Sequence, residues 1–173
     1  YSFGGMLAQF PNYPNTFAPG AQILGNSNFV FAPNAKAGGD GVSINPLQGQ
    51  AVNYCIVMGP SSEALGSALN QSTPAHNSVI LGTALRNFNN YSVNIGSSAV
   101  NTGGLYQDVS GAYSVALGHQ NRVGSSYSAA IGEKNLVNFG TNFSFAIGEN
   151  NIINGGSTYC SMIGHSNIIG GMT

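Results

Sequence analysis

Charged residues are scarce in this chain. Asp, Glu, Lys and Arg make up 5% of its 173 residues, against about 25% in ordinary globular proteins, and the net charge is −1. Disorder usually combines a high net charge with few apolar residues, whereas 42% of this chain is hydrophobic. The composition therefore predicts an ordered chain. It also suits a stack of similar strands, because a charge repeated on every strand would repel its neighbours.

Basic residues and long apolar runs are equally rare. The four Lys and Arg residues are too few to form the basic patch that binds nucleic acid. No run of about 20 apolar residues occurs, so no segment is predicted to span a membrane. Neither a nucleic acid nor a bilayer is an expected partner.

Proline is missing from the second half of the chain. All seven prolines lie between Pro11 and Pro74. Because proline cannot donate to a strand ladder, this asymmetry divides the chain. We expect residues 1–52 to form an irregular, Pro- and Gly-rich cap or a degenerate continuation of the fold in residues 53–173.

One short phrase fills the second half: aromatic, Ser, apolar, small, Ile or Leu, Gly. Four clear copies and two looser ones occupy residues 91–96, 113–118, 127–132, 143–148, 77–82 and 159–164. A phrase that recurs at a nearly fixed period predicts one unit stacked on itself, since a single unit cannot bury its apolar side alone. The repeat therefore predicts a solenoid.

The spacing of the closing glycines predicts the kind of solenoid. These glycines are 14, 22, 14, 16 and 16 residues apart: Gly82, Gly96, Gly118, Gly132, Gly148 and Gly164. A strand rises about 3.3 Å per residue, so 14 residues hold two short strands and two tight turns. Leucine-rich repeats need about 20–29 residues. We predict an all-β roll of about 14–16 residues per coil, with an inserted loop near residues 103–110 explaining the 22-residue step.

Alternation along a strand predicts which side chains share a face. The aromatic and Ile/Leu positions lie on one side of the phrase, and the Ser and small positions lie on the other. We expect the larger residues to fill the interior as stacked files, one of them Leu81, Ile95, Leu117, Ile131, Ile147 and Ile163, the other Tyr91, Tyr113, Tyr127, Phe143 and Tyr159. The small file would lie outside, where another chain could approach closely: Ser92, Ser114, Ser128 and Ser144.

A second motif, Gly-x-x-Asn, follows four copies of the phrase. Glycine and asparagine tolerate positive φ, so the motif predicts a turn. Two mostly apolar residues follow each turn, and we expect one of each pair to complete the core: Val123, Val137, Ile153 and Ile169. Their neighbours Leu136, Ile152 and Ile168 would then stack on an outer face. Such a face predicts burial against another chain, hence an oligomer.

The repeat Ser-Val-Ala-Ile/Leu-Gly-x-x-Asn resembles the head repeat of YadA-like trimeric autotransporter adhesins, and similar repeats occur in phage and viral fibre proteins. The resemblance covers residues 77–173 and, more loosely, 54–59 and 23–28. It implies a left-handed parallel β-roll and a homotrimer about a common axis. The irregular first seventy residues and the lack of a heptad stalk or anchor barrel depart from the family pattern. The trimer-interface candidates are Ser92, Ser114, Ser128, Ser144, Leu136, Ile152 and Ile168.

The two cysteines occupy equivalent positions in the repeat. Cys55 and Cys160 both follow a Tyr, several coils apart. A disulfide needs Cα atoms within about 7 Å, so we predict that these cysteines do not bond to each other.

No combination of residues predicts catalysis. The sequence has no nucleophile with a base and an orienting partner, no phosphate loop and no paired carboxylates, so we expect no enzyme activity and no cofactor. The residue after the closing glycine gives four weak metal-ligand candidates: His119, Glu133, Glu149 and His165. Solenoids keep polar residues at their turns, so we predict a polar file there and no metal.

These expectations favour a non-enzymatic, trimeric surface-fibre module for host attachment, an adhesin head or a viral receptor-binding segment. Its partners would be two further copies and a host surface protein or glycan. The alternative is a structural spacer or self-assembling fibre subunit, and a curli-like amyloid is a third possibility. The inserted loop favours binding, because loops on repeat scaffolds often carry contacts. The candidate binding loop is Gly103, Gly104, Leu105, Tyr106, Gln107 and Asp108.

The expected location is extracellular, on a bacterial cell surface or a virion fibre. Because the chain begins at Tyr1 without an initiator Met or a signal peptide, we expect a processed product or a piece of something longer.

Overall fold

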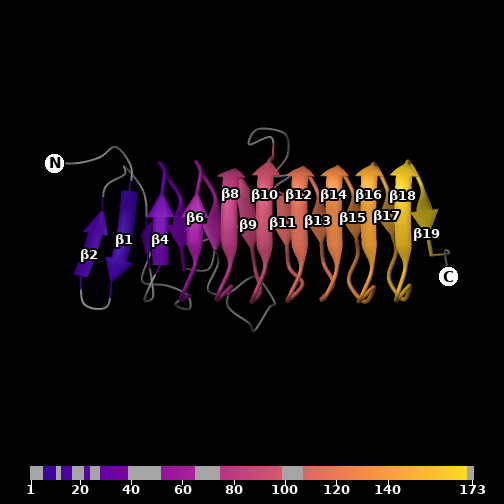
Figure 1. The fold of residues 1–173 in the computed structure, drawn as a ribbon, viewed down its shortest axis with the longest axis horizontal. Helices are drawn as coiled ribbons and strands as arrows, with labels where there is room; N and C mark the ends of the chain where they lie inside the picture. Colours follow the sequence, from indigo (N-terminus) through magenta and orange to yellow (C-terminus); the bar gives the residue numbers. More distant parts are fainter. Residues whose placement is uncertain are drawn as a thin grey trace.

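The computed structural model describes residues 6–10, 13–16, 22–23, 28–38, 52–64, 75–98 and 107–170, the first three segments by their backbone alone. All regular elements among these residues are strands, which form two sheets along one axis (Figure 1). The predicted all-β, solenoid-like class is confirmed.

Sheet A has ten strands and sheet B has nine. Sheet A contains β1 (Met6–Phe10), β2 (Tyr13–Thr16), β4 (Asn28–Phe31), β6 (Ile56–Met58), β8 (Val79–Thr83), β10 (Val93–Ser97), β12 (Val115–His119), β14 (Ala129–Glu133), β16 (Phe145–Glu149) and β18 (Ser161–His165). Sheet B contains β3 (Gln22–Ile23), β5 (Lys36–Ala37), β7 (Glu63–Ala64), β9 (Leu85–Asn87), β11 (Gln107–Val109), β13 (Arg122–Val123), β15 (Leu136–Val137), β17 (Ile152–Ile153) and β19 (Ile168–Ile169).

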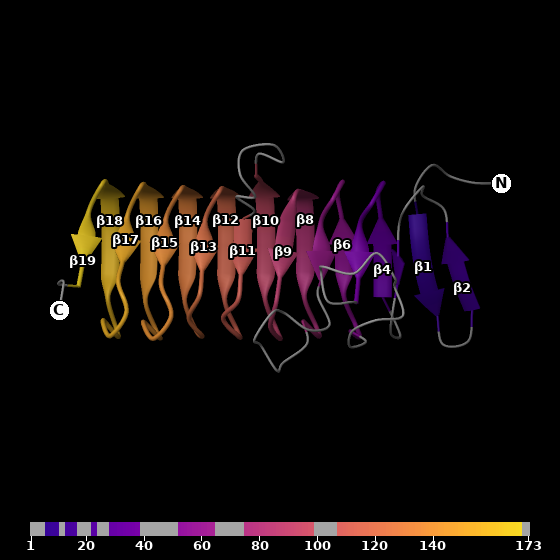
Figure 2. The same ribbon diagram turned by 180° about the vertical axis from the view of Figure 1, so that it is seen from behind.

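The chain alternates between the sheets. From β4 onward each strand of sheet A is followed by one strand of sheet B, and we call such a pair a coil. Successive coils pair in parallel, so the same two strands recur along the stack, as the view from behind also shows (Figure 2). Parallel pairing lets each backbone group that points along the stack bond to the next coil.

Equivalent residues of the phrase stack on one another. Ile131 pairs with Ile147, and Gly132 pairs with Gly148. The copy at residues 54–59 belongs to the same series, because Val57 pairs with Ile80. The looser match at residues 23–28 does not, because Ile23 lies in sheet B, opposite Ala37.

The stack extends toward the N-terminus across residue 52. Strand β4 pairs in parallel with β6, and β5 pairs in parallel with β7. Beyond β4 the pairing changes, because β1 runs antiparallel to both β4 and β2. Residues 28–37 therefore form a coil in the same sheets as the repeats, and an antiparallel hairpin ends sheet A.

The faces of the phrase are the reverse of the expectation. The Ser file is buried, and Ala116, Ala130 and Ala146 are fully buried beside it. The files predicted to be the core lie outside: the stacked aromatic rings are about half exposed or more, and Ile163 is 72% exposed. The predicted alternation along the strand is confirmed, but the side predicted to face the core faces outward.

The reason is the thinness of the coil. Two short strands joined by tight turns leave room between the sheets for side chains from Ala to Ile, such as Ala130 and Ile80 on sheet A and Ile153 on sheet B, with little space for Tyr or Phe. The second apolar file was predicted correctly, because Val123, Val137 and Ile153 are buried. Ile169, on the last coil, is partly exposed.

Candidate functional site

The outer side of sheet A is mostly apolar, and most of its polar side chains lie where the strands end. Two files of side chains cover it from β4 to β18, and only Ser161 among their members is polar. The first is Phe29, Ile56, Val79, Val93, Val115, Ala129, Phe145 and Ser161, and the second is Phe31, Met58, Leu81, Ile95, Leu117, Ile131, Ile147 and Ile163. We call these two files the apolar face.

An aromatic file borders the apolar face where each strand begins. The rings of Tyr91, Tyr113, Tyr127, Phe143 and Tyr159 stack with centroids 4.7–5.1 Å apart and planes within 8° of parallel. An apolar trough of about 380 Å³ lies between these rings and the first file, around the small side chain of Ala129. Such a trough can accept a side chain from another molecule.

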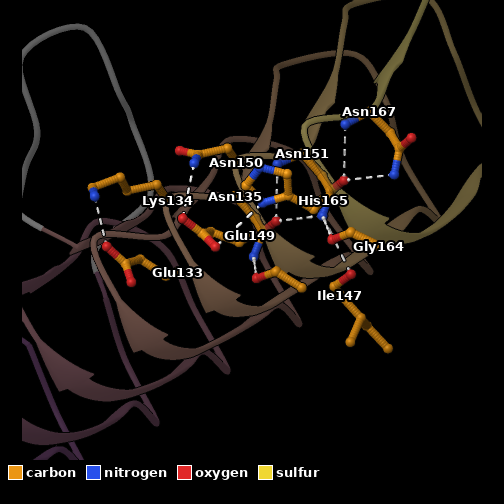
Figure 3. Close-up of polar contacts among 11 residues, drawn as sticks. Glu133, Lys134, Asn135, Ile147, Glu149, Asn150, Asn151, Gly164, His165 and Asn167 are labelled. Atoms are coloured by element: carbon orange, nitrogen blue, oxygen red, sulfur yellow. Dashed lines mark hydrogen bonds and ion pairs between the residues drawn. The ribbon is translucent and has the colours of Figure 1, made fainter.

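A polar file borders the apolar face where each strand ends. It contains the four weak metal-ligand candidates, which pair in register in the order His119, Glu133, Glu149 and His165. Their contacts are local, since Lys134 bonds Glu133 at 2.6 Å and His165 lies 3.2 Å from Glu149 (Figure 3). Lys134 lowers the pKa of the exposed Glu133 carboxyl.

These four side chains do not form a metal centre. Among the residues that the structure describes, no three His, Cys, Asp or Glu side chains are grouped so that they could hold a metal ion. Stacking places one such residue on each coil, and an ion pair joins His165 to Glu149 along the file, while Glu133 pairs with Lys134.

A file of alternating charge runs along the outer side of sheet B. Three of the four basic and two of the five acidic residues of the chain stand in register there: Lys36, Glu63, Arg86, Asp108 and Arg122. Nζ of Lys36 lies 3.0 Å from Glu63, and Nε of Arg86 lies 3.0 Å from Asp108. Each charge thus has an opposite charge beside it, which stabilises neighbouring strands.

Sequence reasoning missed this charged file. The available signal was that each of its members directly precedes an inward-facing residue of sheet B, as Arg122 precedes Val123. Burial raises the pKa of Asp108, although the guanidinium groups of Arg86 and Arg122 act in the opposite direction.

The predicted binding loop includes two residues that are not in a loop. Gln107 and Asp108 begin strand β11. Gln107 is fully buried and donates from Nε2 to Oδ1 of Asn94 at 2.7 Å, while Asp108 belongs to the charged file. The loop interpretation of these two residues is wrong, because the strand of this coil starts earlier than the repeat length suggested. Gly103, Gly104, Leu105 and Tyr106 lie outside the described residues.

The four serines proposed for the trimer interface are also wrongly placed. Ser92, Ser114, Ser128 and Ser144 are buried within the coils. The Ser114 hydroxyl donates to the carbonyl of Ser125 at 2.8 Å and accepts the N–H of Ser128 at 3.2 Å. These serines join successive turns, so they cannot contact another chain.

The remaining interface candidates do face outward on sheet B. Leu136 and Ile152 are partly exposed, and Ile168 is 66% exposed. They continue the charged file beyond Arg122 as an apolar stretch. Beside them a shallow trough of about 310 Å³ is lined by Arg122, Lys134, Leu136 and Ile152, together with three turn amides.

Asparagine side chains form a second internal ladder at the turn that follows the closing glycine. Oδ1 of Asn135 accepts the backbone N–H of Asn151 at 3.1 Å and its Nδ2 at 2.9 Å, and Asn167 bonds Asn151 in the same way (Figure 3). Nδ2 of Asn151 also donates to the carbonyls of Ile147 and Gly164. The left-handed residue of this turn is the one before the asparagine, such as Lys134 with φ 52°.

Both cysteines are free, as predicted. Cys55 is buried, and its thiol donates to the carbonyl of Ala75 at 2.8 Å. Burial raises the pKa of Cys55 to about 11. Cys160 holds the equivalent position on the last coil and is partly exposed.

No element in the described part of the chain is a long apolar helix of the kind that crosses a bilayer. No family model, curated protein or solved structure matches this chain.

Proposed function

We propose that this chain is a segment of a trimeric surface fibre that attaches to a host. In this proposal three left-handed β-rolls of about 14–16 residues per coil pack about a common axis through their apolar faces. The observation that carries it is the apolar face itself, which a single chain leaves open to water.

The size of the apolar face supports a permanent partner. The two files extend about 38 Å over eight strands that lie about 4.8 Å apart, and about 10 Å along each strand, so they present roughly 400 Å². Exposed apolar patches of this size mark interaction sites. No Asp, Glu, Lys or Arg stands in the two described files of the face. An apolar centre bordered by a polar file, such as that of Glu133 and Glu149, is the usual anatomy of a protein interface.

The regular stacking favours identical chains in parallel. In a cyclic assembly every coil meets the equivalent coil of its neighbours, so files of Ile and Leu meet at each level of the stack. The resemblance of the repeat to YadA-like heads argues for three copies. The partners are thus two further copies and a host protein or glycan, at a bacterial surface or on a virion.

The assembly part of the proposal is tested by the mass in solution. Light scattering on the purified chain should give three times the 17.7 kDa of one copy. Ile131→Asp places a charge on the apolar face and should yield folded single chains. Leu136→Asp, its control on sheet B, should leave the trimer intact. A monomeric wild-type chain, or a trimer lost only with Leu136→Asp, contradicts the proposed packing.

The attachment part needs a separate measurement. We expect the purified trimer to bind host cells and a variant lacking residues 103–106 to lose that binding while remaining a trimer. If the variant lacking residues 103–106 still bound host cells, the loop would not be the contact, and the binding site would lie on the lateral surface of the roll.

The alternative function is a structural spacer or a self-assembling fibre subunit, without enzyme activity in either case. Its supporting observation is that equivalent positions carry similar residue types from coil to coil, as in the run Ile131, Ile147 and Ile163. A stable trimer that binds no host surface would favour the spacer. Growth into longer assemblies with rising concentration would favour the self-assembling subunit.

A further inference from the structure

The aromatic file contains three consecutive tyrosines. Tyr91 and Tyr113 have ring centroids 4.7 Å apart, and Tyr113 and Tyr127 are 5.0 Å apart. The planes of the two pairs lie 8° and 1° from parallel. Each phenol therefore has another phenol directly beside it, held by the pairing of their coils.

The three side chains are also open to solvent. Tyr91, Tyr113 and Tyr127 are 48%, 51% and 53% exposed. Their backbone positions are fixed, because each has φ 55° and each N–H donates to a carbonyl of the preceding coil, as Tyr127 does to Ala112 at 2.9 Å. Exposed phenols that cannot move apart favour reaction with each other over reaction between molecules, because their effective concentration is high.

We propose that Tyr91, Tyr113 and Tyr127 form an oxidative cross-linking site, at which neighbouring phenols couple to dityrosine and bond successive coils covalently. The site is independent of the proposed attachment function, since it needs only the stacked coils.

The oxidant that the reaction requires is hydrogen peroxide acting through a haem peroxidase. Each phenol of a pair gives up one hydrogen atom, and the two phenoxyl radicals join through the ring carbons ortho to the oxygens. The two ring hydrogens then move to the oxygens, which restores both phenols. In sum, two phenols lose two electrons and two protons, and the peroxide takes them up to become two waters.

The file supplies its own matched controls. Tyr159 stacks on Phe143, and the residue between Tyr54 and Tyr91 in the file is Asn77, so neither Tyr54 nor Tyr159 has a phenol beside it in the file. Phe143 separates Tyr127 from Tyr159. Tyr113 is the member that both reactive pairs share.

The experiment treats the purified chain with peroxidase and peroxide and maps dityrosine by mass spectrometry of peptides. We expect links from Tyr113 to Tyr91 or Tyr127 within one chain. Tyr113→Phe should reduce these links to background, while Tyr159→Phe leaves their yield unchanged. Phe143→Tyr should add new links to residues 127 and 159. Oxidation should also raise the unfolding midpoint of the wild type but not of Tyr113→Phe, because the link restricts the unfolded chain.

Circular dichroism before oxidation shows whether each variant keeps its strands, so a folding defect is not mistaken for a lost site. Two results would overturn the proposal. One is an absence of links at Tyr113 under conditions that couple free tyrosine. The other is the same set of links from folded and urea-unfolded wild type, which would show that stacking does not direct the reaction.

Discussion

Single residues with a left-handed backbone make each coil turn. The first residue of the phrase, such as Tyr127 with φ 55°, and the residue before each turn asparagine both have this conformation. A non-glycine residue there costs about 1–2 kcal/mol. Hydrogen bonds between coils offset this cost, since the N–H of Lys134 donates to the carbonyl of His119 at 2.8 Å. Aromatic stacking adds about 0.5–1.5 kcal/mol per pair at the other left-handed position.

Closing glycines are required for a different reason, the close approach of the next coil. A Cβ on Gly132, at φ +114°, would lie 2.1 Å from the carbonyl oxygen of Gly148. We predict that Gly132→Ala destabilises the fold by roughly 3 kcal/mol or more, because the obstacle is backbone. Gly156→Ala is the control, since nothing lies within 4 Å of its Cβ and only its φ of +83° is strained. It should cost about 1 kcal/mol. Urea unfolding measures both, and equal losses would contradict the close stacking of the glycines.

The Cys55 thiol should make stability depend on alkaline pH. Its pKa is about 11 in the fold against 9.0 for the ordinary thiol, because burial disfavours the thiolate. The folded chain thus holds this proton more tightly, so stability is complete below pH 9 and falls as pH rises to 11, by roughly 2–3 kcal/mol.

Cys55→Ser is the matched control for this titration. Serine occupies the equivalent position in Ser78 and can donate to the same carbonyl without titrating in this range. The difference in free energy of unfolding between wild type and Cys55→Ser, measured in urea from pH 8 to 11, isolates the thiol because the two chains are otherwise identical. If the free energy of unfolding depended on pH in the same way for both chains, the claim that the Cys55 thiol is buried and protonated would be contradicted.

At the scale of elements, short strands are held by ladders of side chains as well as by backbone pairing. The buried serines of the phrase form a ladder at one turn of the coil, and the turn asparagines form a ladder at the other. Apolar side chains, Ala and Val among them, lie between the two ladders. Because strands such as Leu136–Val137 have only two residues, much of the hydrogen bonding passes through the turns. Both ladders bond along the stack, so they hold each coil at one register relative to the next.

The charged file should fix the register of sheet B. Arg86→Glu would place an acid between Glu63 and Asp108, replacing two attractions by two repulsions in a partly buried row. We predict a loss of about 3–5 kcal/mol in the free energy of unfolding. The control Lys134→Glu changes net charge equally at an exposed turn and should alter stability little.

Burial raises the pKa of Asp108, and a protonated Asp108 no longer repels a neighbouring acid. Lowering the pH should therefore reduce the difference in free energy of unfolding between Arg86→Glu and Lys134→Glu. Chemical denaturation at pH 4 and pH 7 tests this. A loss as small for Arg86→Glu as for Lys134→Glu would show that the charged file contributes nothing to register.

At the scale of the whole molecule, the repeat predicts that the coils stack in register, but it does not determine which face of each strand lies in the interior. The phrase, its closing glycine and the Val file predicted strands in register, and Ile131 does pair with Ile147. Alternation shows that Ser128 and Ala130 share a face, yet it cannot say which face is inside when both sides are regular. Burial usually selects the more apolar side, and that rule is wrong here for the aromatic file, because the space between the sheets accepts side chains such as Ile80 but leaves little room for Tyr or Phe.

Assembly through the apolar face would explain why the larger residues lie outside. The charged file and the start of strand β11 were not predicted from the sequence, for a different reason. Sheet B strands are too short to show a pattern, and the long step before Asp108 concealed its register with Arg86.

The most direct test of the account is disulfide formation between stacked positions, in a background with Cys55→Ser and Cys160→Ser. Neighbouring strands lie about 4.8 Å apart, within the Cα separation of about 4.4–6.8 Å that a disulfide accepts. Ile131→Cys combined with Ile147→Cys should therefore close a bond within one chain under mild oxidation. Ala130→Cys combined with Ile147→Cys should not, and the thiol at position 130 should stay unreactive until the chain unfolds. A bond in the second pair and none in the first would contradict both the register and the assignment of inner and outer faces.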